Sequence, residues 1–151
     1  VQRREEILLT TLINHPKLYD DISENLSTIA FLTLKLDKIR QEVLKSLSEE
    51  STLETEDLVN HLNECGYLVE TRYLLGTKVY GHAYFARPEA SLTEAKAGWK
   101  ETFGQIKGKD LIAEIKEAER DVSENPSDET WRRFLALKRQ KMDEKVWGQS
   151  E

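Results

Sequence analysis

Apolar side chains recur every three or four positions along most of the chain, which is the spacing of one face of an α-helix. The first stripe runs from Ile7 to Ile13 and ends before Pro16, because the residue preceding a proline avoids the α region. Four further helices are predicted: one over residues 16–22, one capped by Thr33 with a stripe from Leu36 to Leu47, one from Thr55 to the C′ residue Gly66, and one over residues 69–75.

A long helix is predicted after an irregular segment. Residues 76–88, GTKVYGHAYFARP, mix glycines and aromatic residues without a helical period, and we expect no regular element there. Ser91 then caps a helix whose period continues to about Glu124. Within it lie Gly104 and Gly108, and a glycine in a helix interior costs about 1 kcal/mol relative to alanine. The stretch between these glycines is a candidate hinge.

A turn at Asn125, Pro126 and Ser127 ends the long helix, and a last helix then runs to about Val146. The two helices are expected to form a hairpin with oppositely charged arms. The acidic arm carries Asp110, Glu114, Glu117, Glu119 and Asp121, and the basic arm carries Arg132, Arg133, Lys138, Arg139, Lys141 and Lys145. Exposed pairs between them are worth about 0.2 to 1 kcal/mol each, so they set the register more than the stability.

The apolar residues of the last helix form two sides rather than one stripe. Trp131, Leu135 and Met142 lie on one side, and Phe134 and Leu137 lie on another. Only one side can face the first arm of the hairpin. A two-helix hairpin of this kind is short, and pieces below about 40 residues rarely hold a fold through their own core. We therefore expect the uncovered side of the hairpin to bind a partner.

Charge and composition narrow the class of protein. The chain has 22 Lys and Arg against 28 Asp and Glu, a formal net charge of −6. It therefore lacks the excess of cations that gives nonspecific affinity for duplex DNA. The single cysteine, Cys65, cannot form an internal disulfide, and no apolar run has the length of a membrane span, so we expect a soluble cytoplasmic protein. Because Val1 already lies in a helical pattern, we interpret the chain as part of a longer protein.

Candidate catalytic and metal-binding groups are sparse. His61 and Cys65 share a helical face at i, i+4, but two ligands do not make a metal site, and the sequence supplies no obvious third. We interpret them as a surface histidine beside a cysteine near a helix end. Gly76 and Gly81 have the spacing of a phosphate loop but are not followed by the required Lys and Ser or Thr. We expect no catalytic residue, metal or cofactor in this chain.

Three classes of function are compatible with these patterns. A protein-interaction module is favoured. A helical domain that binds single-stranded nucleic acid is the second, with basic residues on phosphates and Trp131 or Phe134 stacked on bases. The acidic arm would weaken the field of the basic one, which argues against this class. A nucleotidyltransferase is the third, and it lacks clustered acidic metal ligands.

Several stretches of the sequence share their order with one bacterial family. They are REEILLTTLINHPKLY from Arg4 to Tyr19, LDKIR from Leu36 to Arg40, Gly98-Trp99, LIAEIKEAERD from Leu111 to Asp121, Asn125-Pro126-Ser127, and TWRRFLALKRQ from Thr130 to Gln140. On these stretches the chain resembles, over nearly its whole length, the C-terminal helicase-binding domain of bacterial DnaG-type DNA primase.

The resemblance implies an all-α fold with a helical bundle, C1, over residues 1–100, joined by the long helix to a helical hairpin, C2, within residues 101–151. It implies that the hairpin docks on the N-terminal domains of the hexameric DnaB-type replicative helicase, and that the bundle modulates helicase and primase activity. Primer synthesis would belong to other domains of the parent enzyme, a DNA-directed RNA polymerase using zinc and magnesium. Their E-G-x-x-D and D-x-D motifs do not occur here.

The uncovered hairpin side and the resemblance together predict a helicase-binding set. It comprises the apolar residues Leu111, Ile112, Phe134 and Leu137, with Arg133 and Arg139 at the rim. Gly104 and Gly108 would let the hairpin swing among equivalent sites on the ring. The alternative is that Phe134 and Leu137 pack against the bundle. An exposed apolar hairpin also favours weak dimerisation, whereas strong direct nucleic-acid binding is not expected.

Overall fold

The structure is a computed structural model that describes the backbone of residues 2–149 and the side chains of residues 2–108 and 111–142. Every regular element in the described range is helical, which confirms the predicted all-α class. The chain divides into two compact units, Val1–Phe103 and Gly104–Glu151. This division lies close to the boundary after residue 100 that the resemblance implies.

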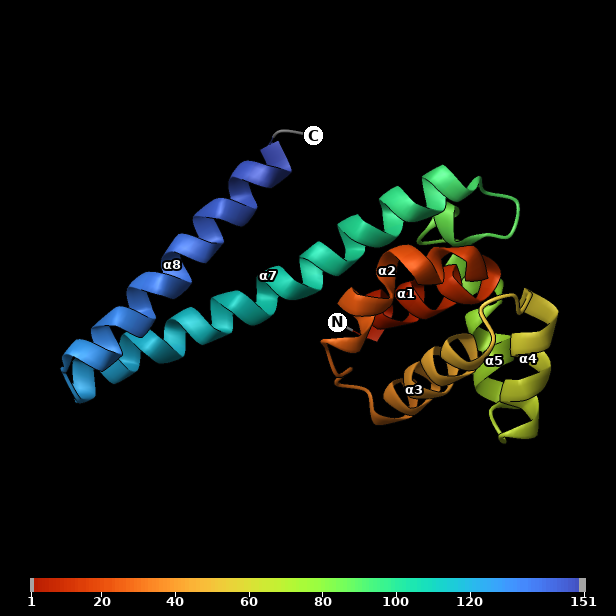
Figure 1. The fold of residues 1–151 in the computed structure, drawn as a ribbon, viewed down its shortest axis with the longest axis horizontal. Coiled ribbons are helices and arrows are strands. Elements are labelled where there is room, and N and C mark those ends of the chain that lie inside the picture. The colour runs from red at the N-terminus through yellow and green to blue at the C-terminus, as the bar shows by residue number, and fades with distance from the viewer. Residues whose placement is uncertain (1, 150–151) are drawn as a thin grey trace. The chain divides into compact units, whose positions relative to one another are not determined.

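The first unit contains most of the helices, and Figure 1 shows their order. They are α1 (Gln2–Asn14), the 3₁₀ helix η1 (Pro16–Leu18), α2 (Tyr19–Ser27), α3 (Leu34–Glu49), α4 (Thr55–Glu64), α5 (Leu68–Leu74), α6 (Thr77–Tyr80), the 3₁₀ helix η2 (Tyr84–Ala86) and the start of α7 (Leu92–Glu124). The second unit contains the rest of α7 and α8 (Asp128–Gln149). The helices expected before residue 76 are all present.

The expectation of an irregular segment over residues 76–88 is wrong in part. Two short helical turns, α6 and η2, form there. Val79 of α6, Ala86 of η2 and Ala83 between them are buried against Ile7 of α1, with Phe85 packed beside them. This packing stabilises turns whose glycines and aromatic residues give no helical period of their own.

Helix α1 lies at the centre of the first unit. It contacts α3, α4, α5, α6, η1 and η2, and every residue from 5 to 13 is buried. The sequence pattern predicted only one apolar face for this helix. Its two buried threonines have partners, since Thr10 Oγ1 donates to Leu74 O at 3.0 Å and Thr11 Oγ1 donates to Ile7 O at 2.7 Å. Hydrogen bonds of this kind remove the cost of burying hydroxyl groups.

The first turns of α7 are fixed to α1 by Trp99. This side chain is fully buried, and its indole N–H donates to Leu8 O at 3.2 Å. The ring of Phe103 stacks on it, with the ring centroids 5.2 Å apart. Gly98 leaves room for Phe85, because a Cβ at this position would lie 2.2 Å from the Phe85 ring. Ser91 Oγ accepts the Glu94 N–H at 3.1 Å, which confirms the predicted cap.

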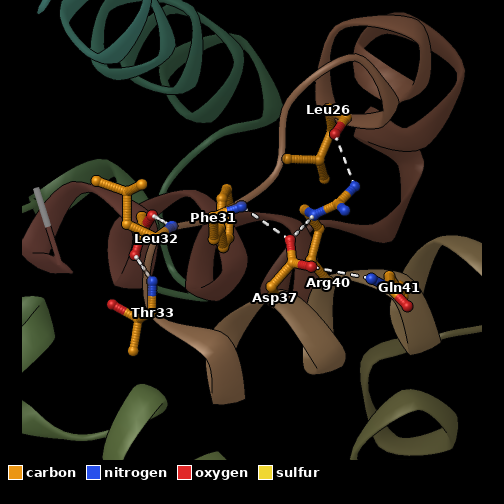
Figure 2. Close-up of polar contacts among 8 residues, drawn as sticks. Leu26, Phe31, Leu32, Thr33, Asp37, Arg40 and Gln41 are labelled. Atoms are coloured by element: carbon orange, nitrogen blue, oxygen red, sulfur yellow. Dashed lines mark hydrogen bonds and ion pairs between the residues drawn. The ribbon is translucent and has the colours of Figure 1, made fainter. Parts of the chain in front are cut away.

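The loop between α2 and α3 is held by a carboxylate from α1. Glu5 accepts hydrogen bonds from the Leu32 N–H at 2.6 Å and the Thr33 N–H at 3.3 Å. Figure 2 marks these two bonds with dashed lines at Leu32 and Thr33. The predicted capping by the Thr33 side chain is wrong, because Thr33 occupies the N-cap position but its hydroxyl makes no capping bond. A residue 28 positions away in the sequence thus binds the end of this loop.

Asp37 binds the other side of the same loop. Its Oδ1 accepts from the Phe31 N–H and from Arg40 Nε, both at 2.8 Å, and its Oδ2 accepts from Gln41 Nε2 at 2.9 Å (Figure 2). Arg40 is buried and also donates to Leu26 O at 3.1 Å. Burial alone would raise the pKa of the Asp37 carboxyl, but the hydrogen bonds from Arg40 and Phe31 outweigh it and lower this pKa below its usual value.

Replacing Asp37 is therefore expected to destabilise the protein in a pH-dependent way. A carboxyl whose pKa is lower in the folded state stabilises the fold above its unfolded pKa, and this stabilisation is lost as the pH falls. Asp37→Asn should lower the free energy of unfolding by about 1 to 3 kcal/mol at pH 7, because Arg40 loses its charged partner. The loss should shrink as the pH falls below 3.8, the ordinary value for this carboxyl. Urea unfolding at pH 7 and at a pH below 3.8 measures this loss of stability. An equal loss in the exposed control Glu24→Gln would contradict the prediction.

Alanine substitutions at Gly98 and Gly104, two glycines of α7, are expected to change the stability of the protein in opposite directions. Gly98→Ala should destabilise the first unit by about 1 to 3 kcal/mol, because the new methyl group overlaps Phe85. Nothing lies within 4 Å of a Cβ at Gly104, so Gly104→Ala should stabilise the helix by about 0.5 to 1 kcal/mol. Urea unfolding of both variants measures the difference. Equal effects of the same sign would show that packing against Phe85 does not explain Gly98.

Candidate functional site

The two helices of the second unit meet at a short turn over residues 125–127, from which α8 turns back (Figure 1). Ser127 and Thr130 bind each other reciprocally: the Thr130 N–H donates to Ser127 Oγ at 3.2 Å, and the Ser127 N–H donates to Thr130 Oγ1 at 3.0 Å. This arrangement satisfies N–H groups that a helix start leaves without partners. The predicted turn and the predicted start of the last helix are confirmed.

The hairpin has an inner face of apolar residues. Ile115 and Ala118 of α7 are buried, and Phe134 and Leu137 of α8 are partly buried. Trp131 stacks on Phe134 with the ring centroids 5.9 Å apart, and Lys138 Nζ lies 5.2 Å from the centroid of the same ring. The Phe134 ring is therefore flanked by two side chains of its own helix.

An ion pair identifies one flank of the hairpin. Arg133 Nη1 of α8 lies 3.1 Å from Asp121 Oδ2 of α7. Successive helix residues are rotated by about 100° around the helix axis. Ile112, three positions before Ile115, and Leu135, one position after Phe134, are therefore displaced from the inner face in the direction opposite to Asp121 and Arg133. In an antiparallel pair, residues displaced in the same sense from the inner face lie on the same flank. Ile112 and Leu135 therefore lie on the flank opposite the ion pair.

This opposite flank is apolar and exposed, and we call it the apolar flank. Its members and their exposed fractions are Ile112 (40%), Trp131 (51%), Leu135 (50%) and Met142 (69%). On α8 they follow each other at steps of four and seven residues, the spacing of one helical face. Exposed large apolar side chains that gather in this way are typical of a surface that binds another protein.

The predicted helicase-binding residues differ in accessibility. Ile112 and Arg139 are exposed, Arg133 is exposed and paired with Asp121, and Leu111 is only 5% exposed. Phe134 and Leu137 are partly buried at the inner face. The predicted hinge glycines lie in a helix that is continuous from Leu92 to Glu124. The side chains of Asp110 and Lys145, assigned to the charged arms, lie outside the described residues.

The sequence reasoning missed Trp131, Leu135 and Met142 as accessible residues. It recognised that the last helix has two apolar sides, but it took Phe134 and Leu137 to be the available side. The pairing of Arg133 with Asp121 is the signal that could have corrected this choice. It fixes which side of α8 faces α7, because the two charges must lie on one flank.

A groove of about 350 Å³ lies in the first unit between α1, α3 and α5. Its apolar lining includes Leu36, Val69 and Tyr73. Glu6 and Glu70 also line it, and each has a buried carboxylate oxygen without a hydrogen-bond partner among the described residues. Such oxygens can accept a donor or a cationic group from a bound molecule.

Helices α3 and α4 bring three potential metal ligands together. Glu42 Oε2 of α3 lies 3.0 Å from His61 Nε2 of α4 and 4.0 Å from Cys65 Sγ, and Sγ lies 3.6 Å from His61 Nε2. His61 and Cys65 are the pair seen in the sequence, and Glu42 is the residue that sequence spacing missed. Partial desolvation, followed by the negative charges of Glu42 and Glu64, raises the pKa of the Cys65 thiol above its usual value.

Comparisons with known proteins do not assign the chain to a family. No protein family, curated protein or solved structure matches it. Among the described residues, no helix combines the length and the apolar character needed to cross a membrane.

Proposed function

We propose that this chain is a non-catalytic protein-interaction module whose hairpin docks on a partner through the apolar flank. Following the sequence resemblance, the partner is the N-terminal domain of the hexameric DnaB-type replicative helicase. Docking would recruit a primase to the replication fork and modulate the activities of both enzymes. The observation that supports this proposal is the exposure of Ile112, Trp131, Leu135 and Met142 on one flank of the hairpin.

The composition of the apolar flank suits a binding surface. Trp131 is the residue type most enriched among interface hot spots, and its stacking on Phe134 holds the ring before a partner arrives. Met142 adds a flexible apolar side chain that adapts to the shape of a groove. These residues would enter an apolar groove as one face of a helix.

The basic residues of α8 indicate the charge of the partner. Arg132, Lys138, Arg139 and Lys141 are exposed. Arg132 and Arg139 lie on the outer face, about half a turn from Phe134, and Lys138 borders the apolar flank. A partner groove with acidic side chains at its rim would complement this surface and would accelerate association.

Binding of single-stranded nucleic acid is the second candidate function. The exposed Trp131 beside basic residues of α8 is the observation that favours it. One face of Trp131 is already covered by Phe134, and the chain carries a net charge of −6. Micromolar binding of a fluorescent oligonucleotide at low salt, weakening steeply with added salt, would support this function over helicase docking.

Truncating side chains of the apolar flank is expected to weaken helicase binding. The double variant Leu135→Ala, Met142→Ala should lower the affinity for the isolated helicase N-terminal domain by at least about tenfold, because hot-spot residues cost about 2 kcal/mol or more when truncated. Isothermal titration calorimetry measures the affinity, and circular dichroism checks that helix content is kept.

Leu34→Ala is the matched control for this variant, because Leu34 is a leucine of the first unit that is 70% exposed. Its binding should be unchanged. Phe134→Ala removes an inner-face ring and tests separately whether Phe134 belongs to the helicase-binding set, as the sequence predicts. Unchanged affinity in the double variant, with the fold intact, would contradict docking through the apolar flank.

Removal of the hairpin should abolish helicase binding without unfolding the first unit. A chain that ends after Asn125 loses α8 but keeps every residue of the first compact unit. The truncated chain should keep the cooperative unfolding of the first unit and should fail to be retained by immobilised helicase N-terminal domain. Retained binding would show that α8 is not needed for the interface, and a melted first unit would contradict two separable units.

A further inference from the structure

The cluster of Glu42, His61 and Cys65 is not used by the proposed function. It lies in the first unit, where Glu42 belongs to α3 and His61 to α4, with Cys65 at the C-cap of α4. Each side chain contributes one atom of a type that binds transition metals: a carboxylate oxygen, an imidazole nitrogen and a sulfur. We propose that these three residues form a zinc site with one position open to solvent.

The separations of the ligand atoms support this proposal. Zinc bonds of about 2.0 to 2.3 Å in tetrahedral geometry place ligand atoms about 3.3 to 3.6 Å apart. The observed separations are 3.0 Å for Oε2 to Nε2, 3.6 Å for Sγ to Nε2, and 4.0 Å for Sγ to Oε2. Shifts of about half an ångström, which side-chain torsions readily supply, would bring all three to those values.

The end of α4 holds two of the ligands on one face. The Cys65 N–H donates to His61 O at 3.0 Å, so helical geometry continues to Cys65 and the two side chains remain one turn apart. Gly66 follows with a φ of +92°, a conformation that L side chains rarely adopt, and ends the helix there. The pair thus lies on ordered backbone, and the packing of α3 against α4 supplies Glu42.

The charge around the cluster favours a divalent cation. Glu42 and the neighbouring Glu64 both act electrostatically on Cys65, with Lys45 as the opposing cation. On binding, the Cys65 thiol would lose its proton to solvent and donate the sulfur electron pair to the metal. His61 would bind as the tautomer with its proton on Nδ1, so the hydrogen bond between His61 Nε2 and Glu42 would be replaced by two metal bonds. The open position is solvent-accessible, since Cys65 is exposed and the other two side chains are partly exposed.

Cobalt provides the direct test, because Co²⁺ bound to a thiolate gives a charge-transfer band in the near ultraviolet. The untagged chain, freed of metal by a chelator, is titrated with Co²⁺ and then with Zn²⁺. Since the chain has a single cysteine, such a band can only report Cys65. We expect the band to form with one equivalent of Co²⁺, to disappear on addition of Zn²⁺, and Zn²⁺ to slow the reaction of Cys65 with a thiol reagent. Absence of the band would overturn the proposal.

Three variants test the ligands, and two control for nonspecific effects. Cys65→Ser should abolish the band, and Glu42→Gln and His61→Ala should each weaken Co²⁺ binding at least about tenfold, because loss of even an outer partner costs about 10- to 100-fold. Glu64→Gln and the exposed-histidine control His82→Ala should change the affinity little. Equal losses in Glu42→Gln and Glu64→Gln would show that negative charge alone attracts the cation and would overturn Glu42 as a ligand.

Thermal unfolding separates metal binding from damage to the fold. Zn²⁺ binds only the folded chain in this scheme, so it should raise the melting temperature of the unmodified protein. It should not raise that of Cys65→Ser, whose melting temperature without metal should match that of the unmodified protein. An equal Zn²⁺-induced rise in both proteins would place the metal elsewhere on the chain and contradict the site.

Discussion

The enclosure of α1 on all sides is the constraint on which the first unit depends. A helix whose residues 5 to 13 are all buried must find partners for polar groups that it carries, because unpaired buried groups are costly. Glu5 does so by binding the loop before α3, Thr10 by binding the end of α5, and the Leu8 carbonyl by accepting from Trp99 of α7. These three polar groups of α1 thus fix the positions of other segments.

The helices whose limits are set by neighbouring residues could be predicted from the sequence. Pro16 ends α1, Gly66 follows α4 with a positive φ, and Asn125 to Ser127 separate α7 from α8. The binding of the α2–α3 loop by Glu5 could not be predicted, because Glu5 precedes its two partners by 27 and 28 positions in the sequence. The short turns α6 and η2 depend on burial against Ile7 for the same reason. Long-range packing leaves little trace in local periodicity.

The candidate sites show the same limit. Spacing placed His61 and Cys65 on one face, but Glu42 comes from another helix, 19 positions from His61, and no pattern connects them. On the hairpin, the two apolar sides of α8 were visible as a pattern. Which side faces α7 depends on the register of the pair, and the Arg133–Asp121 ion pair defines that register. Side-chain periodicity predicts that faces exist, whereas the partner of each face comes from the tertiary arrangement.

The bond from Trp99 to Leu8 has a consequence for how the chain is made. It joins residues 91 positions apart, and Trp99 fills the space beside the central helix. During synthesis, α1 emerges from the ribosome long before the residue that completes its surroundings. The first unit can therefore close only after the opening turns of α7 have emerged, which leaves the buried face of α1 open to chaperones until then.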